Sequence, residues 1–288
     1  MKFGMMFANV GDYATPSAAI EFAQLCEDIG IESLWAVEHT VVPKNYASTY
    51  PYSADGKMAG GQDDFVLPDP LIWLAYVAAA TTKIKLATGV LILPQHNPVI
   101  TAKQVATIDH LSGGRMMLGV GVGWMKEEFD AIGAPFEKRG KRTDEYVAAM
   151  RELWSAKQPS YAGEFVNFTN AYCLPQPVDK RVPIVIGGDS DAAARRAGRL
   201  GDGYFPIKSL PTERIALMRE TALAEGRDPD AIELSTLLMP NKLDRIPELA
   251  EQGISRVVLP SATGAGTLIT SEADVAHWRD AIARYAGI

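Results

Sequence analysis

Apolar and β-branched runs alternate with amphipathic stretches along the whole chain, and this alternation is typical of a parallel sheet covered by helices. The pattern predicts strands over residues 2–8, 33–37, 84–92, 115–120, 183–186, 203–207, 233–238 and 256–259. Eight such segments favour a closed (β/α)8 barrel, the α/β fold known as a TIM barrel, over an open doubly wound sheet.

Helical patterns occupy the stretches between these strands. In residues 17–29, one face carries four apolar side chains, Ala18, Phe22, Leu25 and Ile29, and Gly30 follows as a stop signal. The same periodicity predicts helices over residues 98–111, 143–156, 191–200, 212–224 and 272–285. Because a single barrel needs about 250 residues, we expect one barrel domain over residues 1–288.

The connection after the second predicted strand is too long to be a simple turn. It covers residues 40–68 and is expected as an insertion in the barrel. Its composition indicates a flexible flap that carries aromatic side chains, with Tyr46, Tyr50, Tyr52, Gly60 and Gly61.

A second insertion is expected after the fourth βα unit, over residues 156–182. Residues 161–168 predict a short hairpin there, and a proline-rich stretch follows it. Since barrel enzymes keep their active sites at the carboxyl ends of the strands, the candidate functional residues are those that come just after each strand.

The composition is that of a globular protein that acts on small molecules. With 47% apolar and 22% charged residues the chain can bury a sizeable core, and its formal charge of −7 argues against a general nucleic-acid surface. Cys26 and Cys173 are the two cysteines, which excludes a disulfide framework and a cysteine-rich metal site and fits a reducing cytoplasm. No segment predicts a signal peptide or a membrane span, so we expect neither export nor insertion into a membrane.

Gly187 and Gly188 form a strand, turn and helix-start pattern that can bind phosphate. Two glycines allow the backbone to approach an anion closely, and the amino end of a helix favours negative charge. The alternative is a tight turn capped by Asp189 or Ser190.

The run of alternating glycines Gly119, Gly121 and Gly123 lacks the spacing of a dinucleotide-binding loop and comes fourth in the strand order, so a Rossmann site is rejected. Glycines at a strand end allow a kink or close packing, and the functional alternative is that they clear room for a flat ring.

Acid–base candidates follow two predicted strands. Glu38 and His39 lie at the end of the second strand, and strand alternation sends them to opposite sides, which favours one catalyst and one structural neighbour over a cooperating pair. His96 has a similar position after the third strand. His110 and His277 fall in helices, where a structural role is expected.

The densest positive cluster, residues 137–142, is interpreted as a solvated helix start, with a landing site for an anionic cofactor or substrate as the alternative. The chain has no Gly-Lys-Ser/Thr loop, no Gly-x-Ser-x-Gly elbow and no His-Glu-x-x-His pair. Kinase-like, esterase-like and zinc-protease readings therefore lack support, whereas a barrel hydrolase or aldolase stays possible.

Four segments taken together are more specific than any one of them, and they resemble the luciferase-like monooxygenase superfamily. They extend over most of the chain, from Met1 to about Ile207. The segments are Ser33-Leu34-Trp35-x-x-Glu38-His39; Leu86-Ala87-Thr88-Gly89-Val90 with Pro94-x-His96-Asn97-Pro98; Asp109-x-Leu111-Ser112-Gly113-Gly114-Arg115 with Leu118-Gly119-Val120-Gly121-x-Gly123-Trp124; and 183–188 with Ala197-Gly198-Arg199-x-Gly201-Asp202-Gly203.

Within that superfamily the chain is most similar to the branch that uses the deazaflavin coenzyme F420, with FMN users as close relatives. The resemblance implies a homodimeric (β/α)8 barrel in which Gly187 and Gly188 contact the cofactor phosphate. It also implies that the cofactor ring lies against a bulge with a cis peptide between Gly89 and Val90, in a site that includes Thr88 and Gly121.

By the same resemblance, His39 is expected to exchange a proton with the substrate while a hydride passes to or from the deazaflavin. Sugar-phosphate dehydrogenases of this family have a glutamate where this chain has Trp124, so we expect a less polar substrate in a pocket with Trp124, His96 and the tyrosines of the flap. The alternatives are an FMN-dependent monooxygenase that uses oxygen, and a flavin-binding protein without catalysis.

Overall fold

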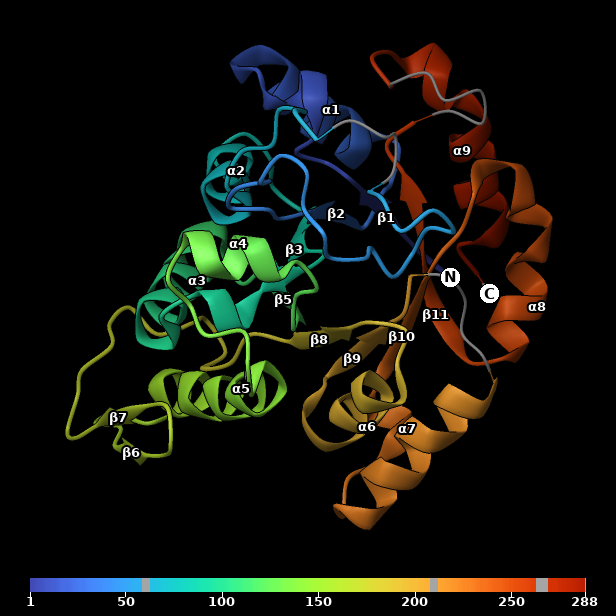
Figure 1. Ribbon diagram of the computed structural model, residues 1–288. Helices are drawn as coiled ribbons and strands as arrows, with labels where there is room; N and C mark the ends of the chain where they lie inside the picture. Colours follow the sequence, from blue (N-terminus) through green and yellow to red (C-terminus); the bar gives the residue numbers. More distant parts are fainter. Residues whose placement is uncertain (59–62, 208–211, 263–268, 288) are drawn as a thin grey trace.

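Eight parallel strands form a closed barrel in the computed structural model, which describes residues 1–58, 63–207, 212–262 and 269–287 (Figure 1). Each strand pairs with its neighbours in chain order, β3 pairs with β5, and β11 pairs with β1 to complete the circle. The barrel strands are β1 (Lys2–Met6), β2 (Ser33–Ala36), β3 (Lys85–Thr88), β5 (Met116–Gly121), β8 (Ile184–Gly187), β9 (Gly203–Phe205), β10 (Glu233–Leu237) and β11 (Ile254–Pro260). The predicted fold class is confirmed.

Helices surround the barrel, and the six predicted ones are all present (Figure 1). They are α1 (Pro16–Asp28), α3 (Pro98–Ser112), α5 (Arg139–Ser155), α6 (Asp191–Leu200), α7 (Thr212–Ala224) and α9 (Glu272–Tyr285). The pattern did not predict α2 (Pro70–Ala78), α4 (Lys126–Ala131) and α8 (Ile246–Glu251). Short 3-10 helices cover Gly11–Ala14, Leu93–Gln95, Pro229–Ala231 and Pro240–Arg245.

The predicted third strand over residues 84–92 is interrupted. It divides into β3 and a short β4 (Leu91–Ile92), with Gly89 and Val90 between them, and β4 pairs with β5 outside the closed circle. The Gly89–Val90 peptide is cis, as the family resemblance implied.

Both predicted insertions are present. The described part of residues 40–68 forms turns and bends without helix or strand, whereas Gly60 and Gly61 lie outside the described residues. In the second insertion, β6 (Tyr161–Ala162) pairs antiparallel with β7 (Asn167–Phe168), which confirms the hairpin.

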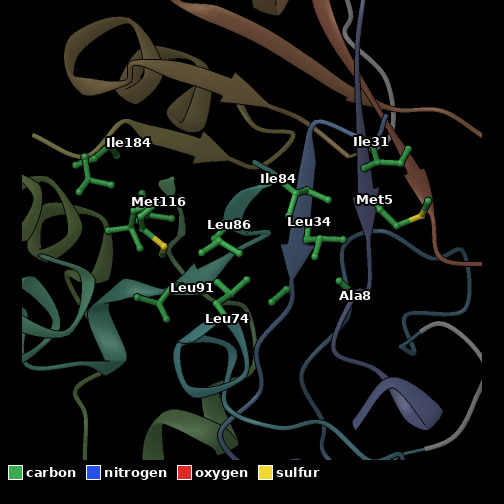
Figure 2. Close-up of a cluster of buried hydrophobic side chains, with 14 of the residues drawn as sticks. Met5, Ala8, Ile31, Leu34, Leu74, Ile84, Leu86, Leu91, Met116 and Ile184 are labelled. Atoms are coloured by element: carbon green, nitrogen blue, oxygen red, sulfur yellow. The ribbon is translucent and has the colours of Figure 1, made fainter. Parts of the chain in front are cut away.

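The strands alternate between two hydrophobic layers. Leu34 points outward into the main layer between strands and helices, where Leu86, Met116 and α2 residue Leu74 join it (Figure 2). Trp35, the next residue, points into the barrel and meets Phe205 with ring centroids 5.0 Å apart. Because the sheet is buried on both faces, the alternation of side chains along each strand determines which of them face the barrel interior.

Charged groups close the amino end of the barrel, where the strands begin. The Arg256 guanidinium lies there with only 2% of its side chain exposed, donates to Glu32 at 3.0 Å and also pairs with Glu233. Nearby, Glu27 accepts from the backbone N–H groups of residues 82–84 at 2.7–3.1 Å. Among the described residues, no helix combines the length and apolar character that a membrane span needs.

Candidate functional site

Three predicted cofactor segments meet around the side chain of Val90 at the carboxyl end of the barrel. A Cβ added to Gly121 would lie 2.5 Å from Val90 Cγ2, and a Cβ added to Gly187 would lie 2.5 Å from Val90 Cγ1. Thr88, two residues before Val90, donates from Oγ1 to the Gly119 carbonyl at 2.6 Å. Val90 is therefore seated between two strands that both need glycine at the contact.

This packing identifies what the alternating glycines do in the protein. The space beside Gly119 is filled by the Thr88 carbonyl, and the space beside Gly123 is filled by Ile92 and Phe129. The close-packing interpretation thus applies at all three positions, since protein atoms occupy the room that the missing side chains leave. Any influence of Gly121 on a bound ring would act through Val90.

The Gly187-Gly188 turn leads directly into the ten-residue helix α6. Gly188 has a φ of +122°, a conformation that L side chains rarely adopt, and its carbonyl accepts from the Tyr204 hydroxyl at 3.2 Å. Ser190 caps the helix by accepting from the Ala193 N–H at 3.2 Å, which confirms one of the two predicted caps. Phosphate binding at this turn stays a prediction.

His39 is held by a buried carboxylate that the sequence analysis did not identify. Its Nδ1 lies 3.1 Å from Glu128 Oε2, and the exposed fractions of the two side chains are 13% and 1%. Glu128 lies in α4, just beyond β5, so the pair joins the ends of two strands. An imidazole with a carboxylate on one nitrogen is an arrangement suited to proton exchange at the other.

Glu38 and His39 face different partners, as strand alternation predicted. Glu38 accepts from His96 Nε2 at 2.8 Å and from the Ile92 backbone N–H. Burial lowers the pKa of His96, but the hydrogen bond from its ring to Glu38 and the charge of Glu38 outweigh this and raise it above its ordinary value. The second strand therefore ends in two separate imidazole–carboxylate pairs.

Trp124 forms an aromatic cluster with the flap and with His39. Its ring centroid lies 5.9 Å from that of His39, 5.4 Å from Tyr46 and 5.2 Å from Tyr50, each in edge-to-face geometry. Tyr52 extends the cluster, with its ring 5.3 Å from Tyr50. The predicted flap tyrosines and Trp124 thus lie together in one apolar wall beside the imidazole.

Two glutamates in the first turn of α4 accept hydrogen bonds from the flap. Glu128 Oε1 accepts from the Thr40 N–H at 2.6 Å, while Glu127 accepts from the Ala47 N–H at 2.7 Å and from the Ser48 hydroxyl at 2.7 Å. Two consecutive carboxylates therefore fix two points of an irregular segment whose backbone donors need partners.

The far end of the flap lies near the glycine turn after β8. Burial raises the pKa values of Tyr50 and Tyr52, and the negative charge of Asp189 raises both further. Asp189 directly follows Gly188, so Tyr50 and Tyr52 lie within electrostatic reach of the predicted phosphate site.

The two remaining histidines lie in helices, as predicted. His110 is exposed in the last turn of α3, and the side chain of His277 is not among the described ones. In the positive cluster, α5 begins at Arg139, which confirms the helix start, but the cluster is not solvated throughout, because Arg142 is buried and donates to the Pro135 carbonyl while Arg139 donates to the Gly123 carbonyl. Within the described residues, no group of three or more His, Cys, Asp or Glu side chains could hold a metal ion.

The residue that sequence reasoning missed is Glu128. The pattern offered one signal, two consecutive glutamates a few residues after the end of β5, but α4 was not predicted. Trp124 stands where sugar-phosphate dehydrogenases of the family have a glutamate, whereas α4 brings another carboxylate to His39 from four residues later.

Comparisons with known proteins identify a family and related chains. Residues 1–252 match the family model described as luciferase-like monooxygenase. An uncharacterised protein of Mycobacterium tuberculosis is 33% identical over 263 residues, which cover 90% of this chain and 91% of that protein. An F420-dependent glucose-6-phosphate dehydrogenase of Kineococcus radiotolerans is 31% identical over 215 residues, which cover 73% of this chain and 58% of that enzyme.

Two solved structures share the fold. An F420-dependent secondary alcohol dehydrogenase, in complex with an F420–acetone adduct, superposes with a TM-score of 0.72 at 20% identity over 90% of this chain and 92% of that one. A monooxygenase from Streptomyces bottropensis superposes with a TM-score of 0.71 at 22% identity over 99% of this chain and 98% of that one.

Proposed function

This chain belongs to the luciferase-like monooxygenase family, and on that basis we propose that it transfers a hydride between the deazaflavin coenzyme F420 and a small, fairly apolar organic substrate. The relative of Kineococcus radiotolerans and the secondary alcohol dehydrogenase, both named as F420-dependent, support this coenzyme.

The observation that carries the proposal is the convergence of four segments at one end of the barrel. Val90 packs against both Gly121 and Gly187, and at the same end of the barrel His39 lies beside Trp124 and the flap tyrosines. Each segment comes from a different strand end, which is how barrel enzymes assemble an active site.

The residues present fit the coenzyme. Gly188 with its positive φ and the start of α6 would hold the phosphate, because backbone N–H groups and the helix dipole favour an anion there. The wedge made by Thr88, Gly89 and Val90, backed by Gly121, would support the ring. When bound, F420 supplies or accepts the hydride.

His39 accepts or donates the proton that accompanies the hydride. In the oxidation of an alcohol, it accepts the hydroxyl proton; in the reverse direction, it returns a proton to the carbonyl oxygen. The aromatic wall of Trp124 and the tyrosines excludes water and selects apolar substrate groups, with His96 as a polar group of the same pocket.

A cofactor titration tests the proposal. Purified protein is titrated with F420 and, separately, with FMN, and binding is followed by the quenching of cofactor fluorescence. We expect saturable binding of F420 that is weakened in a Gly188→Ala variant, and reduction or oxidation of bound F420 by a panel of alcohols and ketones. Retention of FMN together with indifference to F420 would overturn the proposal.

An FMN-dependent monooxygenase is the second candidate, favoured by the description of the family and by the monooxygenase that superposes over 99% of this chain. Oxygen consumption separates the two functions, because a deazaflavin has carbon in place of the reactive ring nitrogen and activates oxygen poorly. Oxygen uptake coupled to product formation with reduced FMN would favour this candidate.

A further inference from the structure

Both oxygens of Glu128 are engaged, and they have different partners. Oε1 accepts from the Thr40 N–H at 2.6 Å and faces the Val41 N–H at 3.4 Å, whereas Oε2 lies 3.1 Å from His39 Nδ1. The Glu128 side chain is 1% exposed, so water does not compete for these positions.

This arrangement determines which ring nitrogen of His39 carries the proton. A carboxylate accepts hydrogen bonds and donates none, so Nδ1 must be the protonated nitrogen of the neutral ring. Nε2 then has the lone pair, and among the described residues it has no hydrogen-bond partner. Trp124, edge-on to the imidazole at 85°, restricts rotation of the ring.

We propose that Glu128 is the positioning residue of this site: it fixes His39 as the Nδ1–H tautomer and thereby makes Nε2 the atom that exchanges the proton. The inference rests on the proposed role of His39 as acid and base. Glu128 also stabilises the imidazolium when Nε2 takes up a proton, because the negative carboxylate stays beside Nδ1–H.

The same carboxylate joins the flap to the imidazole. Thr40 and Val41 form the root of the flap, and their N–H groups bind the oxygen that does not contact His39. The tautomer of His39 and the seating of the flap root therefore depend on one side chain.

A Glu128→Gln variant tests the inference, because an amide cannot accept at both positions. The Thr40 N–H can only donate, so the amide oxygen must face Thr40 and the NH2 group must face His39 Nδ1. The NH2 group would then donate to Nδ1, which forces the proton of the neutral ring onto Nε2. The variant keeps the shape of glutamate and reverses the tautomer.

The tautomer is measured directly by long-range 1H–15N NMR on protein labelled with 15N-histidine. The chain has four histidines, and a His39→Gln variant identifies the signal of His39. We expect the Nδ1–H pattern in the wild type and the Nε2–H pattern in Glu128→Gln. We also expect kcat to fall about 10²–10⁴-fold with little change in KM, as a lost acid–base group implies.

Two controls on α4 separate positioning from general damage. Asp130→Asn removes an exposed carboxylate that pairs with Lys126, and it should leave both tautomer and turnover unchanged. Glu127→Gln alters a flap contact without touching His39, so it should leave the tautomer unchanged. Because both members act through one ring, the double variant His39→Gln/Glu128→Gln should turn over no more slowly than His39→Gln alone.

The Nε2–H pattern in the wild type, assigned with the His39→Gln variant, would overturn the inference even if Glu128→Gln fails to fold. A fall in kcat for Glu128→Gln with an unchanged tautomer would also overturn it, since the role would then be structural. The NMR measurement needs neither cofactor nor substrate, so absence of F420-dependent turnover would contradict the proposed function and leave this inference to be decided by the spectrum.

Discussion

Glutamates form ion pairs at both ends of the barrel, but their basic partners differ. At the amino end, Glu32 and Glu233 pair with the buried guanidinium of Arg256. At the carboxyl end, Glu38 and Glu128 pair with the imidazoles of His96 and His39, at 2.8 and 3.1 Å.

The difference separates stability from chemistry. A guanidinium stays protonated at any pH at which the protein is folded, so the amino-end pairs hold charge and geometry constant. An imidazole gains or loses a proton near neutral pH, so the carboxyl-end pairs can exchange protons with a bound molecule. Substitutions at the amino end should therefore change the free energy of unfolding, and substitutions at the carboxyl end should change turnover.

The largest effect is expected at His39. Replacing it by glutamine keeps a donor for Glu128 but removes the group that exchanges protons, so kcat should fall about 10²–10⁴-fold. The free energy of unfolding, measured by urea denaturation, should change by less than about 1 kcal/mol. Turnover at the wild-type rate would show that the imidazole has no chemical role and would remove the contrast between the ends.

The opposite effect is expected from Arg256→Met. Removing the guanidinium leaves the half-buried Glu32 without its ion-pair partner and Glu233 with Lys2 alone, which should lower the free energy of unfolding by about 3 kcal/mol. The kcat of the folded fraction should stay unchanged. As a control, Arg279→Met breaks an exposed pair with Glu272 and should cost less than about 1 kcal/mol in the same urea titration.

The barrel could be predicted because its signal is repeated. Each strand is a short run of apolar residues, so eight weak patterns support one architecture even where single boundaries are off by a few residues. Helix α2 was missed for a physical reason: its sequence Pro70-Leu71-Ile72-Trp73-Leu74-Ala75-Tyr76-Val77-Ala78 is apolar on every side and lacks the helical period. The break at Gly89-Val90 came from the family resemblance, since a single glycine in the run of residues 84–92 is compatible with one continuous strand.

The site could be predicted in its members but not in its contacts. His39 was identified from its place after a strand, the tyrosines from the composition of the flap and Trp124 from the family resemblance, and the structure brings them together. Glu128 was not, because its pairing with His39 spans 89 positions in the chain and depends on a six-residue helix. Contacts between strand ends are set by the closed barrel, which no local pattern encodes.

A smaller effect is expected at the glycine turn after β8. Gly188→Ala places a side chain where φ is +122°, which costs about 1–3 kcal/mol and displaces the backbone of the predicted phosphate site. We expect about tenfold weaker F420 binding in a fluorescence titration. Gly226→Ala is the matched control, since Gly226 also has a positive φ, of +68°, but lies beyond α7; it should reduce stability and leave F420 affinity unchanged. Equal F420 affinities in the two variants would show that the cofactor phosphate does not bind at this turn.

The smallest effect is expected from pH at the contact between Glu127 and the flap. Hydrogen bonds from the Ser48 hydroxyl and from backbone N–H groups lower the pKa of Glu127 from its ordinary value of 4.5 to about 2. Because the folded-state pKa is lowered, the contribution of Glu127 is complete above pH 4.5 and is lost as the pH falls toward 2. Ser48→Ala removes the largest of these causes, so the loss should begin at a higher pH. The amide chemical shift of Ala47, followed by NMR from pH 6 to pH 2, measures the midpoint of the Glu127 titration.

Glu27 at the amino end is the internal reference: burial opposes its charged form, yet the N–H groups of residues 82–84 also lower its pKa to about 2. Its midpoint should be the same in both proteins, and a shift at both glutamates would mean that Ser48→Ala acts on the whole fold rather than on the flap.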